Sequence, residues 1–113
     1  MQPTDLRVVI TTVPSEAEAE SLVRALLEQR LIACGTIVPG ARSLYRWQGA
    51  VVDATEAVVL LKTTADRLQA LEALGGRIHP YDVPELLAVP IAAGPAPYLA
   101  WVRAETTAPD VLP

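Results

Sequence analysis

The chain has 113 residues, the length of one domain, and a chain of this length buries about two-thirds of its unfolded surface on folding. Its net charge of −4 argues against a nucleic-acid partner, because nucleic-acid domains carry a basic face. No apolar run approaches the roughly 18 residues of a membrane span, and Met1–Leu6 has no charged-then-apolar leader, so we expect a cytoplasmic protein without a membrane span. The single cysteine excludes an intrachain disulfide and suits a reducing compartment.

The first two predicted elements are a strand and a helix. Leu6–Thr12 is a β-branched run that stops at Pro14, which is typical of a strand. Ser15 followed by Glu18 has the form of a capping box, and apolar residues then recur at helical spacing to about Arg30. We therefore expect a strand over 6–12 and a helix over 15–30.

A long hairpin is predicted next. Residues 34–47 have an extended pattern that is interrupted by Pro39-Gly40, which indicates a kink or a bulge. Gln48-Gly49 supplies a tight turn into a second extended segment, residues 50–63. The two arms should therefore pair with each other, with an irregularity in the first arm.

The remaining pattern predicts a helix, a strand and a short helix. Helical spacing begins near Asp66, and Gly75-Gly76 is expected to end this helix, because glycine is favoured just beyond a helix C-terminus. A strand over Glu85–Ile91 and a helix over Pro97–Glu105 follow, and the tail Thr106–Pro113 is expected to fray.

This order of elements predicts the split βαβ arrangement, in which two helices cover one face of a four-stranded antiparallel sheet. The strand over 50–63 is apolar at both parities, with Val58 and Leu60 on one face and Val59 and Leu61 on the other. An exposed second face would alternate with polar residues, so we expect it to be buried against other copies of the chain in a homo-oligomer. The alternative is a bent strand whose two parities are covered by different elements of one chain.

The stretch His79–Glu85 is the strongest candidate for a site. It holds the only histidine, beside a phenol and two carboxylates, and its two prolines restrict the backbone on either side. A stiff loop of this kind can hold side chains in fixed positions. The alternative is a rigid connector in which His79 is hydrogen-bonded at a helix end, since one imidazole is neither a metal site nor a catalytic pair.

Five segments form a recognisable set when they are taken in order. They are Ala33–Gly40, Ser43–Gly49, Glu56–Thr64, His79–Leu86 and Tyr98–Trp101. Together, by their order and spacing, they resemble the CutA family, the divalent-cation tolerance proteins. The resemblance spans about Arg7 to Arg103, nearly the whole chain.

The resemblance implies one CutA-like domain over residues 1–113, with a core of about 7–105. It implies an α+β protomer: a ferredoxin-like βαββαβ sandwich with a long central hairpin and an extra C-terminal helix. Protomers of this family form a tight homotrimer similar to PII signalling proteins, with hairpins exchanged between neighbours. The family is associated with tolerance of copper and other divalent ions, and some members bind copper.

A metal site is the first function that the resemblance implies. Some members place one cysteine and two adjacent histidines where this chain has Thr11, Ile78 and His79, so one of the three copper ligands remains. We expect weak binding of copper or another divalent cation at His79, completed between subunits by Asp82 and Glu85. Cys34 has apolar sequence neighbours, which favours a small buried thiol.

A sensing trimer is the alternative, with clefts between subunits that bind a small molecule or a partner. Lys62 and Glu56 share one parity of the same strand, and aromatic residues supply flat amphipathic surface. The candidate cleft residues are Tyr45, Trp47, Glu56, Lys62, Tyr81 and Glu85, with Trp101 as a further aromatic. The competing interpretation is a buried Lys–Glu pair and aromatic packing that hold the trimer together.

Catalysis is not predicted. The sequence has no Gly-x-Ser-x-Gly elbow, no Walker loop and no His-Glu-x-x-His motif. Cys34 and His79 are the only potential thiolate–imidazole pair, and no third group accompanies them. We therefore expect a non-enzymatic protein.

Overall fold

The computed structural model describes residues 1–107 as an α+β fold built on one main sheet. Its strands are β2 (Leu6–Val13), β3 (Cys34–Trp47), β4 (Ala50–Thr64) and β5 (Leu87–Pro90). They lie in the order β3-β4-β2-β5, and all neighbours are antiparallel. This is the ferredoxin-like order expected from the sequence.

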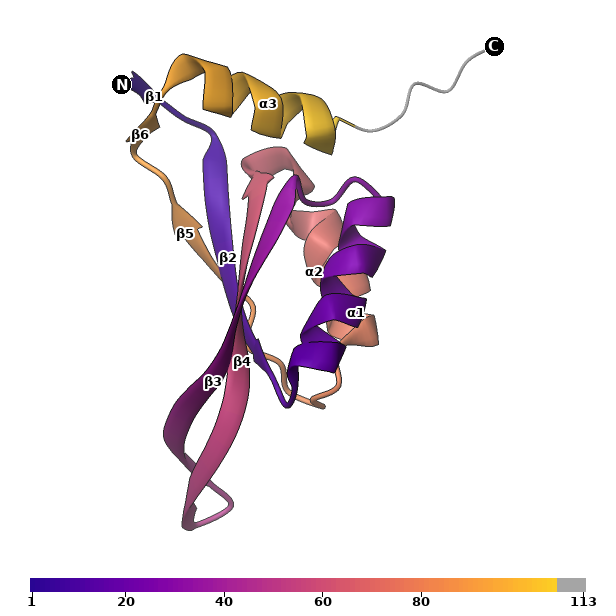
Figure 1. Ribbon diagram of the computed structural model, residues 1–113, viewed down its shortest axis with the longest axis vertical. Helices are drawn as coiled ribbons and strands as arrows, with labels where there is room; N and C mark the ends of the chain where they lie inside the picture. Colours follow the sequence, from indigo (N-terminus) through magenta and orange to yellow (C-terminus); the bar gives the residue numbers. More distant parts are fainter. Residues whose placement is uncertain (108–113) are drawn as a thin grey trace.

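Two helices cover one face of this sheet and a third lies across one end (Figure 1). The covering helices are α1 (Glu16–Glu28) and α2 (Leu68–Ile78), the latter preceded by a 3-10 turn over Ala65–Arg67. The third helix is α3 (Ala96–Thr106). None of these helices, within the described residues, is long and apolar enough to cross a membrane.

The start of α1 forms as its sequence predicts. Ser15 is the N-cap, in extended geometry, and its hydroxyl accepts a hydrogen bond from the backbone N–H of Glu18 at 3.2 Å. Ala19, Leu22 and Leu26 then face the sheet and are buried. The helix packs closely on β3, because a Cβ at Gly35 would lie 2.7 Å from the Val23 side chain.

The predicted hairpin is present and protrudes from the body of the protein (Figure 1). Gln48 and Gly49 both have positive φ, 49° and 80°, as a two-residue hairpin turn requires. The register shifts between Val38 and Ala41, where Gly40 has φ 73°, so the expected irregularity is a β-bulge.

Three predicted boundaries are wrong. The second helix continues through Gly75-Gly76 to Ile78. Gly75 is buried, and a Cβ there would lie 3.7 Å from Leu71 and 3.8 Å from Leu86, so the helix is held by packing at this point. The restriction that Pro80 places on His79 ends the helix.

The predicted strand over 85–91 is shorter, Leu87–Pro90, and Leu86 just before it is packed against the main core. Thr106 does not fray: it ends α3, is 2% exposed, and its hydroxyl donates to the Val102 carbonyl at 2.8 Å. The rest of the predicted tail, from residue 108, lies outside the described residues.

A second, two-stranded sheet was not predicted. It pairs β1 (Gln2–Pro3) with β6 (Ala93–Gly94), near the start of α3. Two-residue strands carry too little pattern to be read from sequence.

The core lies between the helices and the covered face of the sheet. Its main cluster is Val9, Val13, Ala19, Leu22, Val23, Leu26, Leu31, Ile32, Ala57, Val59, Leu61 and Leu71. A smaller cluster lies under α3 and is made of Leu6, Ala33, Leu99 and Val102. The two clusters together account for both the covered face and the end of the sheet.

The second face of the sheet, which we call the open face, has no described helix over it (Figure 1). Ile10, Val58 and Leu60 on this face are only half-buried, and Leu87 is 57% exposed. Both parities of β4 are therefore apolar, as expected, and within the described residues of one chain only one parity is covered.

Candidate functional site

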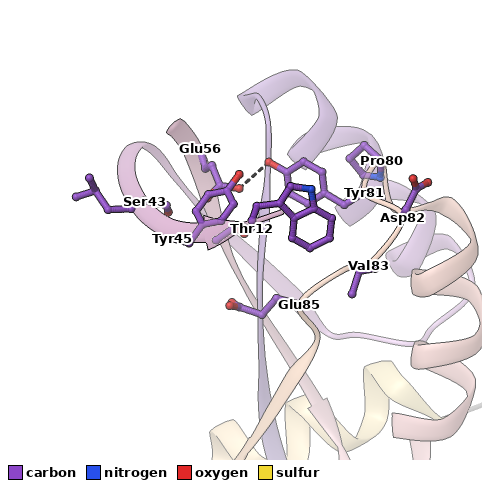
Figure 2. Close-up of a pocket in the computed structure, with 11 residues that line it drawn as sticks. Thr12, Ser43, Tyr45, Glu56, Pro80, Tyr81, Asp82, Val83 and Glu85 are labelled. Atoms are coloured by element: carbon purple, nitrogen blue, oxygen red, sulfur yellow. Dashed lines mark hydrogen bonds between the residues drawn. The ribbon is translucent and has the colours of Figure 1, made fainter. Parts of the chain in front are cut away.

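A cleft of about 690 Å³ lies where the Pro80–Glu85 loop meets the base of the protruding hairpin. Small-molecule sites in proteins are usually about 300–1,000 Å³. The lining residues come from β2, β3, β4 and the loop, and Figure 2 shows the side chains of Glu56 and Tyr81 pointing toward each other. The lining residues are Thr12, Ser43, Leu44, Tyr45, Trp47, Glu56, Pro80, Tyr81, Asp82, Val83 and Glu85.

The strand period places most of these side chains. Ser43, Tyr45 and Trp47 alternate along β3 and so point to one side of the hairpin, because successive strand residues face opposite ways. Thr12 comes from the end of β2 and Glu56 from β4. The loop then brings Tyr81 against them.

Tyr81 and Glu56 form the polar centre of the cleft (Figure 2). The Tyr81 hydroxyl donates to Glu56 Oε2 at 2.6 Å, and Glu56 is only 5% exposed. Burial would raise the pKa of Glu56, but hydrogen bonds from Tyr81, Ser43 and Thr12 outweigh it and hold that pKa below its usual range. Burial and the adjacent Glu56 raise the pKa of Tyr81, so the phenol remains a proton donor.

His79 lies beneath the cleft and is 7% exposed. The backbone N–H of Tyr81 donates to its Nδ1 at 3.1 Å, which leaves the proton of a neutral ring on Nε2. Nε2 lies 2.9 Å from the hydroxyl of Thr11 and donates to it. Burial lowers the pKa of His79, which favours this neutral form.

Within one chain, the groups around His79 do not complete a copper site. Both ring nitrogens hold hydrogen bonds, so a metal ion would have to displace Thr11 or the Tyr81 amide. Ile78 supplies no ligand atom. Among the described residues, no group of three or more His, Cys, Asp or Glu side chains is close enough to share an ion. Asp82 and Glu85 line the cleft instead.

Lys62 does not line the cleft. It lies six positions along the strand from Glu56, a distance of about 20 Å, so the shared parity does not bring the two together. Its ammonium donates to the Thr36 hydroxyl and lies 3.7 Å from Cys34 Sγ. Cys34 is consequently half-buried beside a cation, not in the apolar setting that its sequence neighbours suggest.

The sequence predicts five of the lining residues: Tyr45, Trp47, Glu56, Tyr81 and Glu85. Pro80, Asp82 and Val83 also line the cleft and belong to the predicted stretch His79–Glu85. Thr12, Ser43 and Leu44 are not predicted, although Ser43 shares the parity of Tyr45 and Trp47. Trp101, the further aromatic, lies on α3 against Tyr98, with ring centroids 5.7 Å apart. It is not part of the cleft.

Comparisons with known proteins agree on one family. The family model described as "CutA1 divalent ion tolerance protein" matches residues 7–105. The divalent-cation tolerance protein CutA of Thermus thermophilus is 50% identical over 99 residues, which cover 88% of this chain and 96% of that protein.

Solved structures give the same result. CutA from Synechococcus elongatus has a TM-score of 0.90 at 39% identity, covering 95% of both chains. The periplasmic divalent cation tolerance protein CutA from Archaeoglobus fulgidus has a TM-score of 0.87 at 30% identity, covering 90% of this chain and 99% of that one. The family model matches most of the chain, and the solved structures overlap with it almost completely. This chain therefore belongs to the CutA1 divalent ion tolerance protein family.

Proposed function

We propose that this chain works as a non-enzymatic homotrimer, similar in plan to PII proteins, which contributes to divalent-cation tolerance by binding a small ligand or partner in the cleft. The observation that carries the proposal is the cleft itself. It gathers three aromatic rings and a buried carboxylate around a volume suited to a small molecule.

The open face supports the trimer. Apolar side chains on it, such as Leu60 and Val89, would gain burial in an assembly, and Val89 is 42% exposed in one chain. The edge strands β3 and β5 also present unpaired backbone groups, which a neighbouring protomer can pair. Hairpin exchange between protomers would satisfy both requirements.

The absence of catalysis is supported by the distribution of reactive groups. Cys34 lies beside Lys62 and Thr36, whereas His79 is bonded to Thr11 and Tyr81. The thiol therefore has no imidazole base within the described contacts, and a thiolate–imidazolium mechanism needs one.

Divalent-metal binding at His79 is the second proposed activity, and it requires one of the two ring hydrogen bonds to break. Calorimetric titration of the metal-free protein with copper and zinc measures it. Loss of affinity in His79→Ala supports the ligand role, and unchanged affinity removes it.

We also propose a cytoplasmic location, which the single reduced cysteine suits. The Archaeoglobus fulgidus relative is described as periplasmic, so cell fractionation is the direct test.

Growth under copper stress tests the proposed function. A strain that lacks this protein is complemented with the wild type, with the double variant Tyr45→Ala/Trp47→Ala, or with Glu72→Gln, an exposed change on α2 outside the cleft. Wild type and Glu72→Gln should restore tolerance and the cleft variant should not. Full tolerance with the cleft variant would remove the cleft from the function. Native mass spectrometry of each protein confirms that assembly is unchanged.

A further inference from the structure

We infer that the cleft takes an organic cation, with an ammonium or guanidinium head beside Glu56 and an apolar body between Tyr45 and Trp47. This inference rests on the proposed function of the cleft and adds the chemical class of its ligand. It follows from three independent properties of the site.

The first property is charge. Three carboxylates, Glu56, Asp82 and Glu85, line the cleft, and no lysine, arginine or histidine is among the lining residues. An anionic ligand such as a nucleotide would meet like charges on each side. A cation would be attracted from solution and held there.

The second property is a buried charge without a cation. Glu56 is only 5% exposed, and its side chain points into the cleft (Figure 2). The Tyr81 hydroxyl neutralises no charge, and none of the four ion pairs found in residues 1–107 includes Glu56. A carboxylate removed from water is best stabilised by a positive partner, which a bound ligand would supply.

The third property is the aromatic wall. Tyr45 is 42% exposed and Trp47 50% exposed, although both rings line the cleft. The electron-rich faces of tyrosine and tryptophan attract ammonium and guanidinium groups, and tryptophan does so most strongly. Aromatic rings beside a carboxylate thus select a cation that carries a hydrocarbon part, and they disfavour a small hydrated metal ion.

The test uses two matched probes and the whole protein in its native assembly. Nα-Acetyl-L-arginine amide carries a guanidinium as its only charge, and Nα-acetyl-L-citrulline amide has nearly the same shape with a neutral urea in its place. The acetyl group removes the α-ammonium from both probes, which are called arginine amide and citrulline amide below. Binding is followed by isothermal titration calorimetry and by the fluorescence of Trp47, with Trp101→Phe as background so that Trp47 is the only tryptophan.

We expect arginine amide to bind about tenfold more tightly than citrulline amide, and Glu56→Gln to remove that preference. Glu72→Gln, the matched change on α2, should leave both affinities unchanged. If Glu56→Gln does not fold, Glu85→Gln at the exposed rim should still weaken arginine amide by about twofold to threefold.

Equal binding of the two amides, or binding that Glu56→Gln and Glu85→Gln leave intact, would overturn the inference. Binding of neither amide would also overturn it, and would indicate that a neighbouring protomer fills the cleft. These outcomes are separate from the tolerance experiment. If the cleft variant fails to restore growth and arginine amide does not bind, the proposed role of the cleft stands and only the cationic ligand is rejected.

Discussion

The two faces of the main sheet are formed by the same strands but differ in how far their side chains are buried. On the covered face, Val59 and Leu61 of β4 are 0% exposed, because α1 and α2 lie over them. On the open face, Leu60 of the same strand is half-buried and Leu87 of β5 is 57% exposed. The comparison teaches that one chain completes one layer of its own core and leaves the apolar residues of the other face only partly covered.

The largest effect should come from a charge placed in the middle of the open face. Leu60→Asp would put a carboxylate where the proposed trimer buries an apolar side chain, so we expect assembly to be lost while the secondary structure persists. Native mass spectrometry reports the subunit number and circular dichroism reports the fold. Ala70→Asp on the exposed surface of α2 should keep the assembly. A Leu60→Asp protein that stays trimeric would contradict the role of the open face.

Truncation on the covered face should unfold the chain more readily without changing its assembly pattern. Leu61→Ala leaves a cavity in the main core, which should lower the free energy of unfolding by about 3 kcal/mol. Leu27→Ala, at an exposed position of α1, should cost about 0.5 kcal/mol or less. Denaturant unfolding at one fixed protein concentration measures both, since assembly makes stability concentration-dependent. An equal loss of unfolding free energy in the two variants would contradict the predicted difference between the buried and the exposed position.

The polar end of the open face depends on the bond between Tyr81 and Glu56. Tyr81→Phe removes the donor and leaves a buried carboxylate less well solvated, so we expect a loss of about 2 kcal/mol. Tyr98→Phe is the matched control, because no hydrogen bond of the Tyr98 hydroxyl occurs in the described residues, and it should be nearly neutral. Thermal unfolding at pH 7.5 compares them, and an equal loss in both would mean that the hydroxyl bond contributes nothing specific.

The smallest predicted effect is a dependence on pH. Because the pKa of His79 is lowered by burial, the unfolded chain takes up a proton near pH 6.5 that the folded chain does not. Stability is therefore fully present above that pH and falls below it, by at most about 1.4 kcal/mol per pH unit per chain. Because the pKa of Glu56 is lowered in the folded chain, stability falls further as the pH drops below about 4.5, where the unfolded chain takes up a proton on this carboxylate.

Melting temperatures between pH 8 and pH 5 test this dependence. His79→Asn should flatten the segment between pH 7 and pH 5 and leave the steeper loss at lower pH in place. A wild-type profile that is flat from pH 8 to pH 5 would mean that His79 is protonated equally in the folded and unfolded chains.

Much of the site was predictable from residue types and strand parity. Tyr45, Trp47 and Glu56 lie on the hairpin that the sequence predicts, and the two prolines of the loop predict a rigid mount for Tyr81. Lys62 was wrongly predicted as a cleft residue. Strand parity gives the face that a residue occupies, but not the point along the strand where the loop Pro80–Glu85 packs. The hydrogen bonds of His79 were equally out of reach, since Thr11 is 68 residues away in the chain.

Local sequence by itself determined the elements: β-branched runs, the Ser15 cap and the Gln48-Gly49 turn each act within a few residues. It also determined that the second face of the sheet is apolar, because side chains alternate along β4 whatever covers them. Only the tertiary structure decided that α2 runs past its glycines, that His79 is bonded at both nitrogens, and that the loop and hairpin enclose an acidic, aromatic cleft. These features join segments far apart in the chain, and packing between such segments outweighs local propensity.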